Sequence, residues 1–215
     1  GTRLLYEYPR PDRITGAQEE WIKGYMEEFE EAVVQGRHEE YIDVDSFVDY
    51  YLINELFKDL DAFRSSTYIT KDRGGKLVMG PIWDYDTAMG NRVHYGVWNT
   101  SGWVLGSFQP RTSPVPFWWK MLLKDPGFAN KTIERWKELR RGPLSAENIN
   151  AEIDGAALLL DEAQERNFER WLVLGEYVWP NPEPYPETYE GEVEALRAWL
   201  VARAEWIDGN IESLA

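Results

Sequence analysis

The chain has 215 residues, 43% of them hydrophobic, so it is long enough to bury a sizeable core as one large domain or two small ones. Its 38 acidic and 23 basic residues give a formal net charge of −15, which would on average repel a nucleic-acid backbone or an anionic membrane. There is no apolar run long enough to span a bilayer and no cysteine, and the two histidines are too few to favour a histidine-centred metal cage or a hydrolytic triad.

The N-terminal part of the chain predicts a short strand and then a helix. Residues 3–8 have the composition of a strand that two prolines end, but no neighbouring segment offers it a partner. An unpaired strand suggests that a larger domain begins further upstream. Thr15 and Gln18 form a capping-box pattern, which predicts a helix that runs to about residue 35.

A second helix and a β-hairpin are predicted next. Asp45 and Ser46 offer an N-cap for a helix over residues 46–58, whose apolar residues recur with helical spacing on a continuous face. Residues 67–70 and 76–79 then predict two antiparallel strands, and adjacent glycines in the turn between them supply the positive φ values that such turns need. We expect the helix to be central and the hairpin to follow it directly.

The remaining half of the chain is predicted to be one long loop followed by helices. Residues 90–113 are rich in Gly, Ser, Asn and Trp without any period, which is typical of a long ordered loop. Beyond it, caps such as Asp125 with Pro126 and Ser145 divide the sequence into segments. The predicted helices span residues 115–124, 126–141, 146–172 and 188–213.

Four carboxylates flank the predicted hairpin. The two outer ends of an antiparallel hairpin lie side by side, so Asp59 and Asp61, before the first strand, become neighbours of Asp84 and Asp86, after the second. Clustered carboxylates repel one another unless a cation or a proton compensates them, and oxygen ligands suit Mg²⁺ or Ca²⁺. The pattern therefore predicts an acidic, metal-binding site at this end of the hairpin.

A purely structural explanation is also open for each acid taken singly. Any one of them could cap a helix or form an ion pair with Arg64 or Lys71. Four acids at one end of a hairpin favour a functional site over four unrelated structural roles.

The segments around these acids carry a family resemblance. Four stretches, 45–56, 61–68, 75–77 and 80–86, closely resemble the spore coat protein H (CotH) kinase family, and the Trp-Asp-Tyr-Asp run at 83–86 is the most specific of them. Residues 116–119 and 164–168 are weaker matches that extend the resemblance over the whole chain.

The resemblance implies an α+β, mainly α fold: a protein-kinase-like helical lobe with one small β-hairpin that carries the acidic site. Residues 1–215 would be a single domain, the C-terminal lobe of a CotH kinase-like domain. By this resemblance Asp61 is the catalytic residue that orients the substrate hydroxyl or accepts its proton, and Asp84 binds the metal ion. Catalytic acid, hairpin and metal ligand follow one another in the same order in ordinary protein kinases.

Two departures from ordinary kinases limit what the resemblance implies. Ser66 stands where those kinases place a metal-binding Asn, so Ser66 contributes to cofactor binding only weakly and the metal rests more on Asp84 and Asp86. There is also no glycine-rich phosphate loop followed by a strand lysine. We expect the nucleotide-covering lobe to lie upstream of Gly1, which would leave residues 1–215 inactive on their own.

The implied cofactors are Mg²⁺ (or Mn²⁺) and ATP, and the implied substrate is a protein with a Ser or Thr hydroxyl. The family suggests a bacterial parent that is associated with the spore coat, the cell surface or the extracellular space. Two alternatives remain open: a carbohydrate-binding or carbohydrate-active module and a non-catalytic interaction domain. The first would use exposed tryptophans as stacking platforms. The candidate platforms are Trp98, Trp103, Trp118 and Trp119.

Overall fold

The computed structural model describes residues 4–107 and 115–215, and within these ranges helices predominate around one small antiparallel sheet. This confirms the predicted α+β, mainly α class, while the likeness to a kinase lobe stays a prediction. The α-helices are α1 (Gly16–Val34), α2 (Val44–Phe57), α3 (Val104–Ser107), α4 (Phe117–Lys124), α5 (Pro126–Arg140), α6 (Ala146–Arg170) and α7 (Tyr189–Asn210). Shorter elements are the 3-10 helices η1 (His38–Glu40), η2 (His94–Gly96) and η3 (Ile211–Leu214), with strands β1 (Ile69–Lys71) and β2 (Leu77–Met79).

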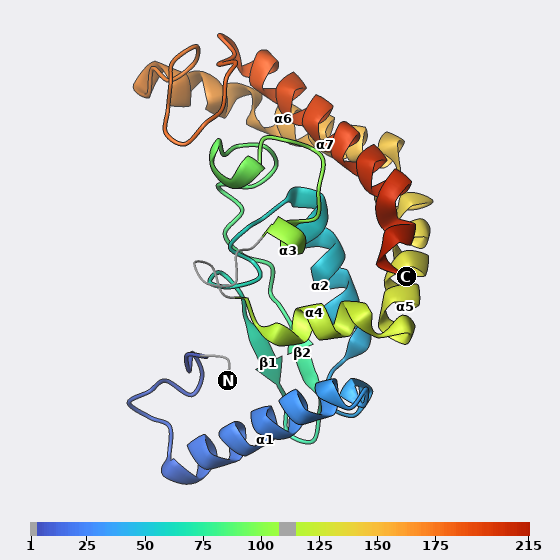
Figure 1. Cartoon of the computed structure of the whole chain (residues 1–215). Coiled ribbons are helices and arrows are strands. Elements are labelled where there is room, and N and C mark those ends of the chain that lie inside the picture. Colours follow the sequence, from blue (N-terminus) through green and yellow to red (C-terminus); the bar gives the residue numbers. More distant parts are fainter. Residues whose placement is uncertain (1–3, 108–114) are drawn as a thin grey trace.

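Helix α2 lies at the centre of the molecule, as its continuous apolar face predicts (Figure 1). It packs against α5, α7 and β2, while α1 contacts α4, and α6 pairs with α7. The core around α2 is aromatic: Trp118 and Trp119 of α4 and Trp136 of α5 are each only 1% exposed. Large rings bury much apolar surface, so a few of them hold this layer of helices together.

The start of α2 differs from the prediction. The N-cap is Asp43, whose Oδ1 accepts a hydrogen bond from the Ser46 backbone N–H at 2.9 Å, and not Asp45 or Ser46. The backbone N–H of Asp43 also donates to the carbonyl of Leu77 in β2 at 2.8 Å. This long-range bond fixes the residue at which the helix begins, and sequence spacing alone does not contain it.

The predicted hairpin is confirmed with slightly shorter strands. Ile69 pairs with Met79 and Lys71 with Leu77, so the turn falls where the glycines place it. A parallel bridge from Ile42 to Leu77 covers the other edge of β2. The hairpin is thereby joined to the segment that leads into α2, and the two form one scaffold.

The predicted N-terminal strand is wrong for the described residues 4–8, and residue 3 lies outside the described part. This segment forms no strand, and Leu5 and Tyr8 are 85% and 92% exposed. A strand is stable only when its backbone groups find a partner, and the sheet in the described part of the chain consists of β1 and β2, with which residues 4–8 do not pair. The helix after it is confirmed together with its capping box at Thr15.

The helices of the second half agree with the prediction to within a few residues. Asp125 caps α5 through the Phe128 backbone N–H at 3.0 Å, and Ser145 caps α6. The last helix ends at Asn210 and continues as η3. The predicted loop over 90–113 contains η2 and α3, and residues 108–113 of it lie outside the described part.

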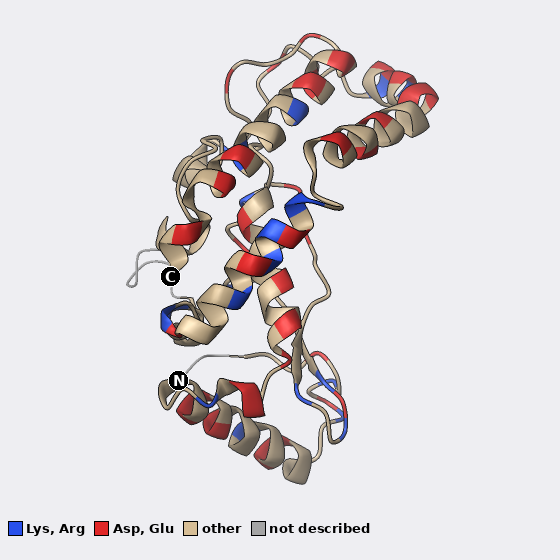
Figure 2. Cartoon of the chain, turned by 90° about the vertical axis from the view of Figure 1, so that its right-hand side faces the viewer, with Lys and Arg blue, Asp and Glu red and all other residues tan. Residues whose placement is uncertain are grey.

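Acidic residues are spread along the helices of the molecule (Figure 2). In the described part of the chain, no helix combines the length and the apolar character that crossing a membrane requires.

Candidate functional site

The end of α2 and the segment after β2 are held together by contacts between them. The Tyr85 hydroxyl donates to Oδ1 of the fully buried Asn54 at 2.6 Å, and the Met89 backbone N–H donates to the carbonyl of Phe57 at 2.6 Å. The rings of Phe57 and Tyr85 also meet edge to face, with 5.5 Å between their centroids. These contacts therefore fix the two acidic segments of the sequence relative to each other.

Asp61 lies on a tight turn directly after α2. Its carbonyl accepts hydrogen bonds from three successive backbone N–H groups, those of residues 64 to 66, at 2.8 to 3.1 Å. Its carboxylate lies between two arginines: Oδ1 is 2.7 Å from Nη2 of Arg64, and Oδ2 is 3.6 Å from Nη1 of Arg92. The ion pair with Arg64 is the structural role that the sequence left open, and the second oxygen is held much more loosely.

Ser66 and Asp84 join the two sides of the site. The Ser66 hydroxyl donates to Oδ2 of Asp84 at 3.1 Å, across 18 positions of sequence. Asp84 adopts φ = 71°, the left-handed region that is uncommon for a residue with a side chain, although Asp tolerates it better than most. The exposed Asp84 carboxylate thus faces the turn that carries Asp61, as the hairpin geometry predicts.

Asp86 is exposed and lies two residues further along. Its backbone carbonyl accepts a hydrogen bond from the Asn91 side chain at 3.1 Å, which ties down the chain after the Trp-Asp-Tyr-Asp run. Within residues 4–107 and 115–215, no three acidic or histidine side chains come together as a ready-made metal cage. Mg²⁺ needs no such cage, because it commonly takes one or two carboxylates and completes its shell with water and substrate phosphates. The exposed Asp84 carboxylate, with Asp86 nearby in the chain, fits that mode.

Asp59 is the buried acid beneath the site, with 1% of its surface exposed. Its Oδ1 accepts the backbone N–H of Asp61 at 2.9 Å, so it helps to fix the turn, while its Oδ2 is buried without a hydrogen-bond partner. The pKa of Asp59 is raised to about 6: burial is the main cause, the charges on Asp61 and Asp84 add to it, and backbone N–H bonds act in the opposite direction. The sequence identified this acid but gave no sign of its depth.

A buried ion pair fixes the loop next to the site. Glu55 of α2 accepts the backbone N–H groups of Val104 and Leu105 at 2.7 and 3.0 Å, and Arg203 of α7 lies 3.2 Å from its Oε2. Burial raises the pKa of Glu55, whereas the positive charge of Arg203 lowers it. Both side chains are fully buried. The loop before α3 is thus pinned to α2 and α7 together.

Lys58 adds a second tie to the same loop. It ends α2 with φ = 55°, and its Nζ donates to the carbonyls of Gly96, Asn99 and Ser101, with distances of 3.0 Å to the first and 2.6 Å to the third. Burial, and to a smaller extent the charge of Arg203, lowers the pKa of Lys58 to about 8. The residue just before the acidic turn therefore has a structural role that its sequence position did not indicate.

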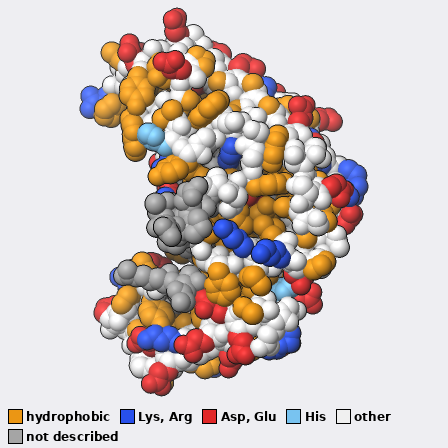
Figure 3. Space-filling view, in the orientation of Figure 1, with side chains coloured by type: hydrophobic (Ala, Val, Ile, Leu, Met, Phe, Trp, Pro, Cys, Tyr) orange, Lys and Arg blue, Asp and Glu red, His pale blue; other side chains and the backbone are white. Residues whose placement is uncertain are grey.

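Of the tryptophans that the carbohydrate alternative named, only some are exposed. Trp98 is 52% exposed, and its carbonyl accepts the indole N–H of Trp199 at 2.9 Å. Trp118 and Trp119 are buried and cannot stack on a sugar, and Trp103 is half-buried. Figure 3 shows hydrophobic side chains at the surface both at the end of the molecule that carries α1 and at the end that carries α6 and α7.

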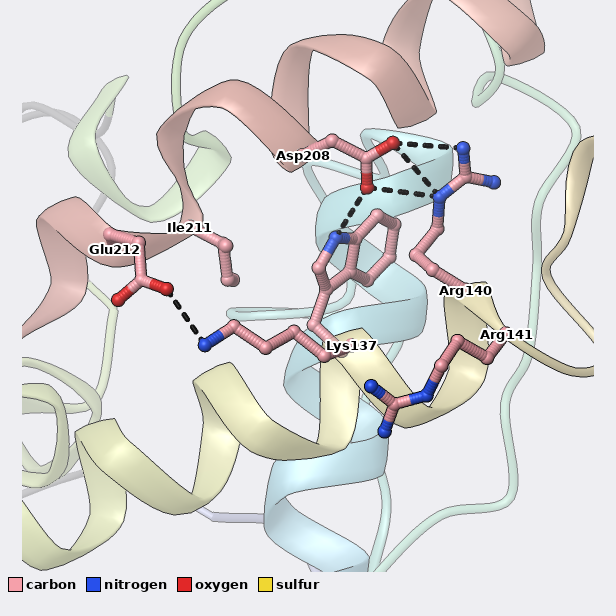
Figure 4. A pocket seen from close by; sticks show the side chains of 7 residues that line it. Lys137, Arg140, Arg141, Asp208, Ile211 and Glu212 are labelled. Atoms are coloured by element: carbon pink, nitrogen blue, oxygen red, sulfur yellow. Dashed lines mark hydrogen bonds and ion pairs between the residues drawn. The ribbon is translucent and has the colours of Figure 1, made fainter.

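A cavity of about 440 Å³ lies elsewhere, between α5 and the C-terminal end of α7 with η3 (Figure 4). Its charged side chains mostly satisfy one another: Arg140 pairs with Asp208 at 2.8 Å, and Lys137 pairs with Glu212 at 2.8 Å. The indole N–H of Trp136 donates to Asp208 as well. None of the acids at the hairpin lines this cavity, which is a junction between helices.

Comparison with known proteins identifies the family of this chain. The family model described as CotH kinase protein matches residues 3–207. The chain belongs to the CotH kinase family. No curated protein and no solved structure gave a significant match.

All four hairpin acids lie inside the region that matches the CotH kinase family. The structure brings Ser66 into contact with Asp84 and sets Asp61 on the same turn as Ser66, whereas among the described residues the Asp86 carboxylate has no hydrogen bond or ion pair with any of the three. The roles predicted for these residues stay predictions. Sequence reasoning missed Arg92 as a partner of Asp61, and only its position soon after the acidic run could have drawn attention to it.

Proposed function

We propose that this chain supplies the acidic part of a phosphoryl-transfer site, which in the parent protein moves phosphate from ATP to a Ser or Thr hydroxyl of a protein. The observation that carries the proposal is the hydrogen bond between Ser66 and Asp84, because it sets the predicted metal ligand beside the turn that bears Asp61. Membership of the CotH kinase family supports a kinase-like relationship.

In this proposal Asp61 acts on the acceptor hydroxyl. Its Oδ2 accepts the hydroxyl proton as the hydroxyl oxygen forms a bond to the γ-phosphorus, and the bond from that phosphorus to the bridging oxygen breaks to release ADP. Asp84, with Asp86 and the weaker ligand Ser66, holds Mg²⁺ or Mn²⁺. The bound metal neutralises phosphate charge during transfer.

The remaining parts of the proposal concern the parent protein. Because no glycine-rich loop with a strand lysine occurs in residues 1–215, we place the nucleotide-covering lobe upstream, with residues 1–215 as the C-terminal lobe and inactive alone. The family name suggests a bacterial parent on the spore coat or cell surface.

The test is transfer of labelled γ-phosphate to protein, by a protein that joins residues 1–215 to their native upstream lobe. We expect Asp61→Asn and Asp84→Asn each to abolish Mg²⁺-dependent transfer, whereas Asp161→Asn, at an exposed position of α6, should leave it unchanged. Transfer that survives both substitutions would mean that these acids are structural.

One observation favours the carbohydrate-binding alternative. Trp98 and Trp179 are 52% and 66% exposed, and flat exposed rings are suitable platforms for sugars. A rise in melting temperature with oligosaccharides but not with Mg²⁺ and ATP would support that function. If neither changes the melting temperature, the non-catalytic interaction domain is the better description.

A further inference from the structure

Arg92 has donors at the acidic site that the protein itself leaves unused. Its side chain is 16% exposed, and its Nε is buried with no hydrogen-bond partner. Its Nη1 reaches the Thr87 hydroxyl only at 3.5 Å and lies 3.6 Å from Oδ2 of Asp61. A guanidinium carries five N–H groups, and burying a charged donor without partners is costly.

Arg203 shows what a purely structural arginine looks like in this chain. It is fully buried, and each of its three nitrogens donates at 2.7 to 3.2 Å to carbonyl oxygens or to the Glu55 carboxylate. Arg92 is also largely buried, but beyond a cation–π contact with the Tyr95 ring at 5.6 Å it makes only one marginal hydrogen bond and one long ion pair. The difference indicates that the Arg92 guanidinium is arranged for a group that comes from outside the chain.

Two guanidinium groups meet at the Asp61 carboxylate. Arg64 and Arg92 both approach it, in a chain whose net charge is −15, so positive charge is concentrated at this point of an otherwise acidic site. Arg64 already makes a close contact with Asp61 at 2.7 Å, so the loosely held Arg92 is the cation free to turn to another partner. Phosphate suits a guanidinium well, because its oxygens accept two parallel N–H bonds.

We propose that Arg92 is a phosphate-binding residue of this site, which takes an oxygen of the nucleotide's terminal phosphate. This inference rests on the proposed function. Because Arg92 then donates to phosphate, Oδ2 of Asp61 is left free for the acceptor hydroxyl, while Arg64 keeps Oδ1 in place.

The test measures two kinds of binding on residues 1–215. Pyrophosphate affinity is measured by calorimetry in the presence of Mg²⁺, and Mn²⁺ affinity without phosphate is measured by electron spin resonance. We compare Arg92→Met, which keeps the length but removes the charge, and Arg92→Lys, which keeps the charge but loses the fork. Arg166→Met, on the exposed face of α6, is the control.

We expect Arg92→Met to weaken pyrophosphate binding about 10- to 100-fold, Arg92→Lys to weaken it less, and the control to leave it unchanged. Mn²⁺ binding should be the same in all three variants and should fall only with Asp84→Asn. In the wild-type protein, the Nε–H resonance of Arg92, assigned by its absence in Arg92→Lys, should shift on addition of pyrophosphate, and this readout holds even if Arg92→Met fails to fold.

The outcomes separate the two proposals. The role of Arg92 is overturned if wild-type protein binds no pyrophosphate. It is also overturned if wild type and Arg92→Met bind pyrophosphate equally and the Nε–H signal does not shift. In either case the proposed function stands if Asp84→Asn still abolishes Mn²⁺ binding. Wild-type protein that binds no Mn²⁺ counts against the proposed function itself. If pyrophosphate binding still depends on Arg92 in that case, Arg92 is a phosphate-binding residue even though the proposed function is wrong.

Discussion

The replacement of Arg203 by Met tests whether the buried ion pair holds the loop beside the acidic site. The substitution keeps most of the side-chain volume but removes the charge that faces Glu55, together with hydrogen bonds to three backbone carbonyls, those of residues 55, 100 and 102. Removing one partner of a buried pair costs about 3–5 kcal/mol, because the other charge is left buried without compensation. That is a large share of the roughly 5–15 kcal/mol by which most proteins are stable.

The pH dependence of this loss gives a sharper check than its size. Burial raises the pKa of Glu55 and the charge of Arg203 lowers it, so Arg203→Met should raise that pKa further. Glu55 then takes up a proton more readily in the folded variant than in the unfolded chain. The variant should therefore lose less stability, relative to wild type, at acidic pH than at alkaline pH.

The assay is urea unfolding followed by tryptophan fluorescence, at one alkaline and one mildly acidic pH. A double variant, Arg203→Met with Glu55→Gln, removes the uncompensated charge and should regain at least about 1 kcal/mol of what the single variant loses. It should not regain everything, because the three carbonyls stay without their donor. A single variant within about 1 kcal/mol of wild type at alkaline pH, or a double variant no more stable than the single one, would refute the reasoning.

Two further predictions concern acids whose roles the structure redefines. Burial raises the pKa of Asp59 from 3.8 to about 6, so the folded chain binds more protons than the unfolded chain within that window, and its stability falls as the pH rises through it. Asp59→Asn lacks this loss, and from about pH 4 to about pH 7 its stability measured by urea unfolding should gain about 2 kcal/mol on wild type; a constant difference would contradict the burial of the charge. At the start of α2, Asp43→Ala should lower the free energy of unfolding by about 1 kcal/mol in thermal unfolding, because it removes the N-cap. Asp45→Ala should lower it clearly less, because the ion pair of Asp45 with Lys131 is exposed. Equal losses would mean that Asp45 caps the helix, as the sequence predicts.

The parts of this fold that follow from sequence are those with a local cause. The capping box at Thr15, the Asp125 cap with its following proline and the glycine turn of the hairpin each act over a few residues, and each was found where its pattern predicts it. The proximity of the two acidic segments was predictable for a related reason. Once the hairpin is placed, its geometry alone brings the turn at Ser66 next to Asp84.

The features that escaped prediction depend on contacts between distant segments. Glu55 and Arg203 are 148 residues apart, and nothing in the spacing around either one indicates the other. The N-cap at Asp43 was missed because its bond to Leu77 decides between two equally suitable aspartates. The depth of Asp59 likewise depends on what packs over it and not on its neighbours in sequence.

The unequal contacts of the Asp61 carboxylate connect these observations to the proposed chemistry. Arg64 lies three residues away on the same turn and holds Oδ1 at 2.7 Å, so the carboxylate keeps its orientation whether or not a ligand is bound. Arg92 approaches Oδ2 only to 3.6 Å and comes from a loop segment beyond the hairpin. A catalytic carboxylate needs one oxygen fixed and the other accessible to the hydroxyl, and this arrangement provides both. In the proposed mechanism, phosphate bound at Arg92 would free the Asp61 oxygen that accepts the proton, and nucleotide binding would thereby prepare Asp61 for the transfer.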